Sequence, residues 1–185
     1  APISNLIVFH KNNAQGEMGE FCERVFDQSS WYPIDRCYYN YLRIYVPAST
    51  QLLGATPHAV TRDDMIFLDK DIPARVDILD WEEIENVQAF GTLLFVRMGE
   101  GLNTSFRFGL PATVLEHGPD ARTQVYRLKI QKQAGIISAP VTVRVHLPSG
   151  AEVQSISPLG LQEGDDILFE LELRKDIEIE IVFTP

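Results

Sequence analysis

The chain has 185 residues, 45% of them apolar and 23% charged, and its 26 acidic against 16 basic side chains give a net charge of −10. This composition is typical of a folded globular protein and excludes a disordered chain. Nucleic acid is excluded as a partner because its binders need clustered Lys and Arg, and an anionic membrane surface would repel the chain. Apolar stretches such as residues 87–96 run to about ten residues against the roughly 20 of a membrane-crossing helix, so we expect no direct membrane insertion.

The chain begins with Ala1, Pro2 and Ile3, without an initiator Met or an apolar leader, and we expect an excised fragment or a processed form. From there, apolar and polar residues alternate along most of the length, which predicts short β-strands. The predicted strands are residues 5–10, 20–26, 38–46, 87–96, 105–110, 126–130, 141–147, 167–173 and 177–183. Residues 87–96 are apolar enough for a central strand. Helical periodicity is nearly absent, with one short helical turn expected at 80–85.

The last two predicted strands flank the turn 174–176, and each alternates apolar with acidic residues. This pattern predicts a β-hairpin with one apolar and one acidic face. Its acidic side chains would then lie near one another in pairs, Glu172 with Glu178 and Glu170 with Glu180. Such pairs are destabilising unless a neighbouring strand supplies cations, and Arg127 and Lys129 are the natural candidates.

Short strands separated by Pro and Gly turns predict an all-β fold, in which antiparallel sheets pack face to face. The segment 42–47 is echoed at 143–148, and the match continues to Pro57 and Pro158. We therefore predict two tandem immunoglobulin-like β-sandwiches, residues 1–111 and residues 112–185. A single large β-sandwich is the alternative, because any two strand–Pro turn–strand segments resemble each other.

Cys22 and Cys37 are the two cysteines of the chain, and a turn-like segment separates them. Their spacing suits a disulfide that closes a loop of about 16 residues and stabilises the fold by about 3 kcal/mol. A disulfide predicts an oxidising compartment. Two free buried thiols in a cytosolic protein are the alternative, and a metal site is disfavoured because no His or second Cys pair accompanies them.

The densest aromatic run of the chain lies in the predicted strand 38–46. By alternation, one face carries Tyr38, Leu42, Ile44 and Val46, which we expect to face the core. The opposite face carries Tyr39, Tyr41, Arg43 and Tyr45. Tyrosine and arginine combine apolar area with hydrogen bonding, so this face is a candidate platform for sugar rings or a protein partner. The alternative is that the face packs under residues 48–85 or against the second domain.

No catalytic motif is present: the chain has no Gly-x-Ser-x-Gly elbow, no Gly-rich phosphate loop and no His-x-x-x-His pair. The four histidines are dispersed, and we expect surface side chains at His10, His58, His117 and His146. Acidic runs in the predicted loops lack the spacing of a calcium site and indicate solvated acids. We expect no enzyme, no cofactor and no metal.

Four stretches, 37–47, 52–58, 90–96 and 126–135, occur in an order that resembles a bacterial family catalogued as domain of unknown function 4012. The resemblance covers about residues 37–150. It implies the β-rich C-terminal part of a large surface protein, which an N-terminal transmembrane helix anchors to the outer face of the cytoplasmic membrane. It brings no catalytic residue.

Together these observations predict a non-enzymatic, extracytoplasmic structural or interaction module of a larger bacterial cell-surface protein. Its expected partners are other domains of that protein, surface proteins or glycans. A carbohydrate-binding module that uses the tyrosine face is the alternative.

Overall fold

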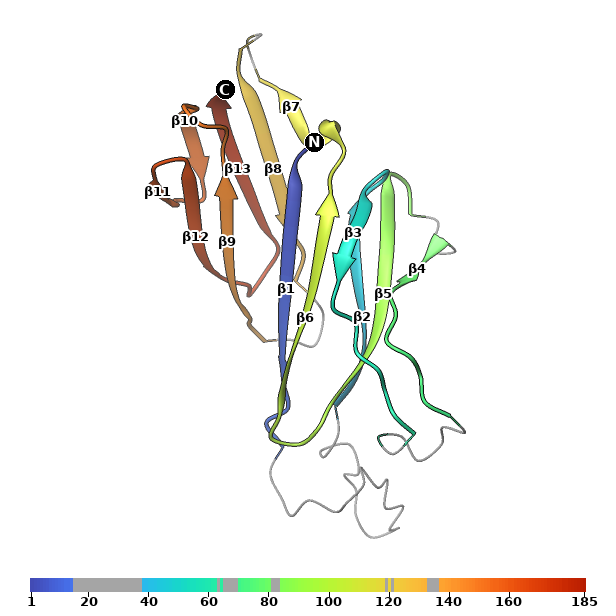
Figure 1. Ribbon diagram of the computed structural model, residues 1–185. Coiled ribbons are helices and arrows are strands. Elements are labelled where there is room, and N and C mark those ends of the chain that lie inside the picture. The colour runs from blue at the N-terminus through green and yellow to red at the C-terminus, as the bar shows by residue number, and fades with distance from the viewer. Residues whose placement is uncertain are drawn as a thin grey trace. The chain divides into compact units, whose positions relative to one another are not determined.

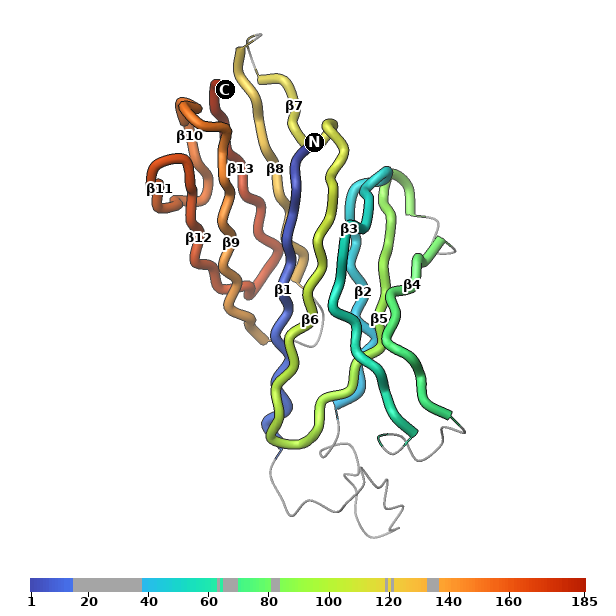
Figure 2. Tube along the Cα trace, viewed as in Figure 1, coloured from blue at the N-terminus to red at the C-terminus, as the bar shows by residue number. Residues whose placement is uncertain are grey.

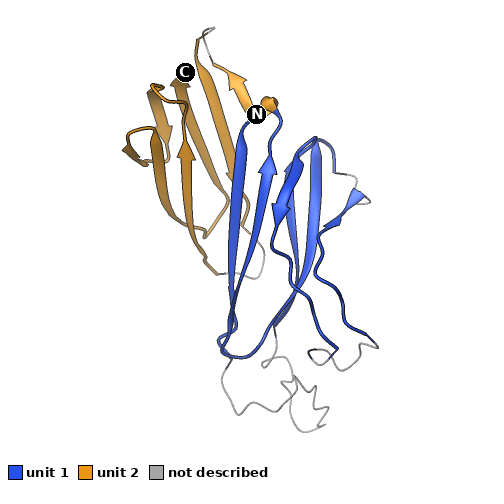
Figure 3. Cartoon of the chain, in the orientation of Figure 1, with its two compact units in different colours: residues 1–111 blue, residues 112–185 orange. Residues whose placement is uncertain are grey.

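The computed structural model describes residues 1–14, 38–62, 64, 70–80, 84–118, 120, 122–132 and 137–185 (Figure 1). This part of the chain is all-β, as the alternation predicts: its strands form four small antiparallel sheets, and its described residues contain no α-helix. The chain divides into two compact units, Ala1–Pro111 and Ala112–Pro185 (Figure 3). That the two units are separate, independently folding domains stays a prediction.

Unit 1 (Ala1–Pro111) consists of two three-stranded sheets with the orders β1-β6-β3 and β2-β5-β4. Its strands are β1 (Ile3–Lys11), β2 (Tyr38–Pro47), β3 (Gln51–Ala55), β4 (Asp77–Ile78), β5 (Val87–Val96) and β6 (Gly101–Gly109). Ile44 and Phe90 from one sheet and Phe106 and Phe108 from the other form a buried core. The rings of Phe90 and Phe108 are 5.5 Å apart across it. As predicted, β5 is the central strand of its sheet. Of the expected core face of β2, Leu42, Ile44 and Val46 pack in the core, whereas Tyr38 at the start of the strand is 40% exposed.

Unit 2 (Ala112–Pro185) consists of a four-stranded sheet, β10-β13-β8-β7, and a three-stranded sheet, β11-β12-β9. A 3-10 turn at Ala112–Val114 precedes β7 (Leu115–His117), β8 (Gln124–Ile130), β9 (Pro140–His146), β10 (Glu152–Ser157), β11 (Leu161–Glu163), β12 (Asp166–Glu172) and β13 (Ile177–Thr184). The core combines Ile167 and Phe169 of β12 with Ile179, Ile181 and Phe183 of β13. Each unit is therefore sandwich-like, with apolar faces of two sheets turned inward.

The two units share one strand order once β7 is set aside, because β8 to β13 take the places of β1 to β6. In both, the chain passes from one sheet to the other at the same proline turn, between β2 and β3 and between β9 and β10 (Figure 2). The backbone N–H of Thr50 donates to the oxygen of Pro47, and that of Ala151 to the oxygen of Pro148, at 3.2 and 3.0 Å. The two segments that match in sequence therefore occupy equivalent positions in the two units.

Local irregularities of the backbone also recur at matching positions of the two units. Ser49 and Gly150, at matching positions of the proline turns, both have a positive φ, 68° and 83°. The pairing of β3 with β6 shifts register between Leu52 and Gly54, and that of β10 with β13 shifts at the matching place, between Val153 and Ser155. A bulge inserts one unpaired residue and bends the strand, and bulges at equivalent places indicate one common plan for the two units.

The immunoglobulin-like topology is not confirmed. Numbered from β7, the seven strands of unit 2 form sheets in the orders 4-7-2-1 and 5-6-3. A seven-stranded immunoglobulin domain has the orders 1-2-5-4 and 3-6-7. The last strand of unit 2 therefore lies in the sheet position that the fifth strand has in an immunoglobulin domain.

The predicted C-terminal hairpin is wrong, because β12 pairs with β9 and β11 whereas β13 pairs with β8 and β10. The two strands lie in different sheets and face each other across the core, so their acidic residues do not meet. Alternation shows which face of a strand is buried but not which strand lies beside it. Of the expected cations, Arg127 lies opposite Glu180 and forms an ion pair with it, whereas Lys129 lies opposite Glu178 but forms its ion pair with Asp176.

Several sequence predictions lie outside the described residues. They are the strand at 20–26, the two cysteines Cys22 and Cys37, and residues 81–83 of the expected helical turn. The disulfide therefore stays a prediction.

Candidate functional site

The outer face of β2 carries the four predicted site residues: Tyr39 and Tyr41 are half-buried, Arg43 and Tyr45 are exposed, and the guanidinium carbon of Arg43 lies 5.9 Å from the centre of the Tyr41 ring. Tyr39 donates its hydroxyl to the backbone oxygen of Asp64 at 2.8 Å, and its ring lies 4.9 Å from the ring of Phe95. Tyr41 is also held by a residue of the 48–85 segment, because its hydroxyl donates to Asp77. Arg43 and Tyr45 are more exposed, with 49% of Tyr45 in contact with solvent. The covering expected as the alternative is found for half of this face, so the four side chains do not form one open platform.

Tyr41 reaches across the central strand β5 to the edge strand β4. Its hydroxyl donates to Asp77 Oδ2 at 2.9 Å, while Arg75 Nε lies 2.9 Å from Asp77 Oδ1. The ring crosses β5 above Gly91, where an added Cβ would lie only 2.5 Å from the Tyr41 hydroxyl oxygen. Gly91 therefore provides the space through which the outer strands of this sheet are joined. Burial, followed by the hydrogen bond to Asp77, raises the pKa of Tyr41 above its ordinary value.

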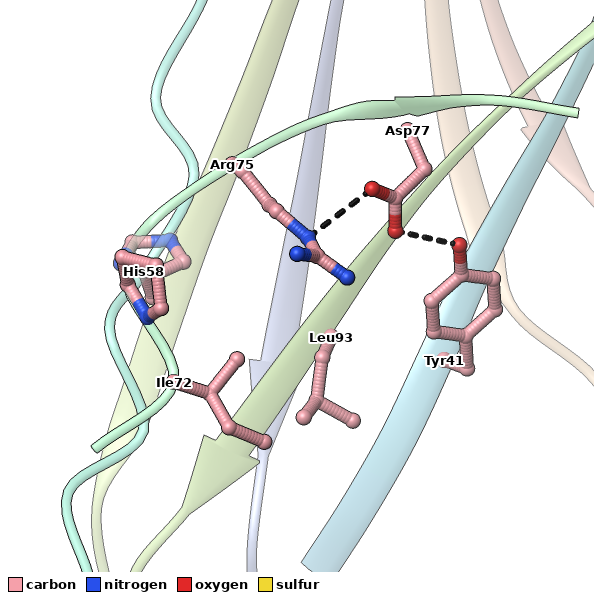
Figure 4. A pocket seen from close by; sticks show the side chains of 7 residues that line it. Tyr41, His58, Ile72, Arg75, Asp77 and Leu93 are labelled. Atoms are coloured by element: carbon pink, nitrogen blue, oxygen red, sulfur yellow. Dashed lines mark hydrogen bonds and ion pairs between the residues drawn. The ribbon is translucent and has the colours of Figure 1, made fainter. Parts of the chain in front are cut away.

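A small pocket of about 120 Å³ lies beside this hydrogen-bonded group (Figure 4). Its lining residues are Tyr41, His58, Ile72, Pro73, Arg75, Asp77 and Leu93. Both carboxylate oxygens of Asp77 are engaged, and the His58 ring nitrogen Nε2 lies 3.0 Å from the backbone oxygen of Asn103. With a raised pKa, Tyr41 stays a neutral phenol at pH 7. These groups hold the described residues of the 58–77 segment on the sheet and offer hydrogen bonds.

Asp64 anchors the same segment at its other end. Thr61 donates to Asp64 Oδ2 through its backbone N–H and its hydroxyl, at 3.0 and 2.7 Å. The Arg97 guanidinium donates to Oδ1 at 2.9 and 3.2 Å. Burial of Asp64 opposes its ionisation, but the hydrogen bonds from Thr61 and Arg97 outweigh it, and the pKa of Asp64 lies below its ordinary value. This carboxylate is a structural group.

The outer face of β1 is a second candidate site, which the sequence predictions did not identify. Ile3, Ile7 and Phe9, called here the β1 stripe, are 53%, 69% and 63% exposed. Phe9 lies against the adjacent strand, since an added Cβ at Gly101 would be 2.7 Å from its ring. The opposite face of β1 belongs to the core, where Leu6 packs against the apolar cluster. β1 is therefore apolar on both faces although one face is open to solvent.

Unit 2 carries charged side chains at the matching position of its own sheet. Opposite Ile7 and Phe9, β6 carries Ser105 and Asn103, whereas the corresponding pairs of unit 2 are Arg127 with Glu180 and Lys129 with Glu178. Arg127 Nε lies 2.7 Å from Glu180 Oε2, and Arg127 also contacts Glu116 of β7. The shared fold tolerates charged residues here, so it does not require the apolar β1 stripe.

The signal for the β1 stripe is present in the sequence as an uninterrupted apolar run, residues 6–9. Such a run is typical of a strand buried on both faces, and it gives no indication that one face stays open. His10 is a related miss. It lies on the inward face of β1 and is 8% exposed, so the expectation of a surface side chain is wrong for this histidine. His146, by contrast, is exposed and lies 2.9 Å from Asp166 Oδ1.

No protein-family model matches the chain, and no curated protein or solved structure matches it either. Within the described ranges, no group of three His, Cys, Asp or Glu side chains is placed to hold a metal ion. The same residues include no helix long and apolar enough to cross a membrane.

Proposed function

We propose that this chain is a non-enzymatic interaction module that binds another protein through the outer face of β1. The observation that carries the proposal is the exposed β1 stripe, Ile3, Ile7 and Phe9. Large exposed apolar patches on proteins of this kind mark interaction sites. Because ion pairs occupy the matching position in unit 2, the fold itself does not account for the stripe.

The energetics favour a partner that covers this face. Full burial of an Ile or Phe side chain contributes about 1.5 to 3 kcal/mol. More than half of each stripe residue is in water, so a partner would gain about 1 kcal/mol from each of them. A cluster of three such residues on one rigid strand has the properties of an interface centre, around which polar contacts form a rim.

We further propose that the module works outside the cytoplasm, as part of a larger bacterial surface protein. Support comes from the two cysteines in the sequence and from the resemblance of residues 37–150. Mass spectrometry of non-reduced protein after alkylation tests this location. A single species without free thiols is expected, and two alkylated thiols would contradict the disulfide on which the compartment depends.

Site-specific crosslinking tests the interaction itself. A photoreactive phenylalanine analogue replaces Ile7 in one protein and Arg127, its counterpart in unit 2, in another, and each is irradiated in cells that naturally produce the chain. We expect a discrete crosslinked product from position 7 that disappears when Phe9→Lys is added, and none from position 127. Equal products from both positions, or a product indifferent to Phe9→Lys, would contradict the proposal.

Carbohydrate binding is a second candidate, supported by the pocket beside Tyr41. Sugar sites combine an apolar ring surface with hydrogen-bonding side chains, and this pocket places Tyr41, Arg75 and Asp77 around Leu93. A glycan array probed with the natural chain and with the Arg75→Ala variant tests it. Binding that needs Arg75 is expected if the candidate is right; an array without binding, or binding retained in the variant, would refute it.

A further inference from the structure

One edge of β1 has backbone groups directed away from its sheet. The backbone oxygen of Pro2 accepts from the N–H of Leu110 at 2.9 Å, and the N–H of Asn12 donates to Glu100 at 3.0 Å, both across the β1–β6 pair. Backbone groups of alternate residues face the same neighbour in an antiparallel pair, so even-numbered residues face β6 and odd-numbered residues face the opposite edge. In the described part of the chain, no strand pairs with that edge.

Unit 2 shows that this edge position accepts a further strand. There β7 lies antiparallel to β8, with Glu116 opposite Val125, and the N–H of Gly118 donates to Thr123 at 2.8 Å. Val125 corresponds to Asn5 in β1, because their partners Val182 and Arg107 each lie opposite the residue that follows the matching register shift in β10 and β3. No described strand of unit 1 fills, beside β1, the position that β7 fills in unit 2.

We propose that the β1 edge pairs with β1 of a second copy of this chain, antiparallel and about an axis at Leu6, so that two unit 1 sheets become continuous. This inference rests on the proposed function and names as a partner a second copy of the chain, which contacts the β1 stripe from the side, through cross-strand pairs on the outer face. In that register, Ile3 of each copy lies opposite Phe9 of the other, and Asn5 lies opposite Ile7. All four are odd-numbered residues, whose backbone groups already face the edge.

The composition of β1 suits such a pairing. Natural edge strands avoid self-association with charged side chains, prolines or bulges. The pairing of β1 with β6 is regular from Ile3 to Lys11, and the one charged residue of β1 is Lys11, at its end. A two-fold axis lets the same apolar residues serve both copies, which is the commonest symmetry of protein dimers. On the inner side, Leu6 would meet Leu6 and extend the core.

The net charge of each copy and the size of the contact determine how tightly the two copies should bind. Each copy carries a net charge of −10, so the copies repel each other at low salt and added salt should strengthen the pairing. The contact is small compared with a standard interface, so we expect a weak dimer, with a dissociation constant of about 10⁻⁵ to 10⁻³ M.

Sedimentation equilibrium of the whole chain tests the dimer. We expect the average mass to rise toward twice the monomer value as protein concentration increases, more so at about 0.5 M than at about 0.05 M NaCl. The double variant Ile7→Lys, Phe9→Lys should weaken association at least tenfold. Leu53→Lys is the matched control, because Leu53 is an exposed apolar residue on β3 of the same unit, and it should associate like the natural chain. Thermal unfolding checks that each variant is folded.

Amide hydrogen exchange separates edge pairing from a loose apolar contact. In the dimer, the amides of Asn5, Ile7 and Phe9 should gain protection, while those of Leu6 and Val8, which face β6, should change little. A chain that stays monomeric up to about 1 mM, or protection without this alternation, would overturn the inference. If the chain is monomeric while position 7 crosslinks to a different protein, the inference fails and the proposed function stands.

Discussion

Replacement of Gly91 by alanine tests the way in which Tyr41 joins the strands of unit 1. The new Cβ would lie 2.5 to 2.7 Å from the hydroxyl oxygen and two ring carbons of Tyr41. The backbone of buried β5 cannot yield, so the ring must swing away and lose its 2.9 Å hydrogen bond to Asp77. A hydrogen bond to a charged group is worth about 1.5 to 3 kcal/mol. Alanine regains about 0.5 to 1 kcal/mol over glycine in a strand, so we expect a net loss of about 1 to 2 kcal/mol.

Urea unfolding at pH 7 measures this loss, with Gly54→Ala as the matched control because nothing lies within 4 Å of a Cβ at that position. The control should change the free energy of unfolding by less than about 0.5 kcal/mol. Tyr41→Phe in the Gly91→Ala background completes a double-mutant cycle, in which the second change should cost almost nothing because the hydrogen bond is already lost. Unchanged stability of Gly91→Ala, or fully additive effects, would refute the reasoning.

Three further predictions concern stability. Burial, and secondarily the charge of His58, lower the pKa of His10 below its ordinary 6.5. Because the unfolded chain then binds the proton more readily, the free energy of unfolding should fall as pH drops below about 6.5. The urea midpoint of the His10→Asn variant should fall less steeply over the same pH range. The pKa of Asp64 is lowered, so its contribution to stability is present above about pH 4 and lost as pH falls through the folded-state pKa. The Asp64→Asn variant should lose about 1 to 3 kcal/mol of unfolding free energy at pH 7 and much less at pH 3. An equal loss at both pH values would contradict the assignment of Asp64 as an ionised structural group. Residues 112–185, expressed alone, should unfold cooperatively in circular dichroism because their core is self-contained, and a fragment without a transition would refute two independent domains.

The sequence predicted the features of the fold that depend on one strand at a time. The alternation in β2 and β12 placed Ile44 and Phe169 in the core, and both are buried. Which strand lies beside which depends on long-range pairing that no local pattern encodes. This is why the pattern of β12 and β13, adjacent in sequence and matched in polarity, predicts a hairpin although the two strands belong to different sheets.

The candidate sites show the same division between local pattern and tertiary context. Alternation correctly grouped Tyr39, Tyr41 and Tyr45 on one face, but the covering of the first two comes from Asp64 and Asp77, which are distant in sequence. The β1 stripe was missed because Ile7 and Phe9 lie in an apolar run that is typical of a buried strand. Its exposure depends on whether another element covers the outer face of β1, which no local pattern encodes.

The most direct test of the central claim is photocrosslinking from β1. With the photoreactive group at position 7, we expect a discrete product that Phe9→Lys abolishes, and no product from position 127, the matching site of unit 2. Products of equal yield from the two positions, or no product from position 7, would contradict the assignment of the outer face of β1 as an interaction surface.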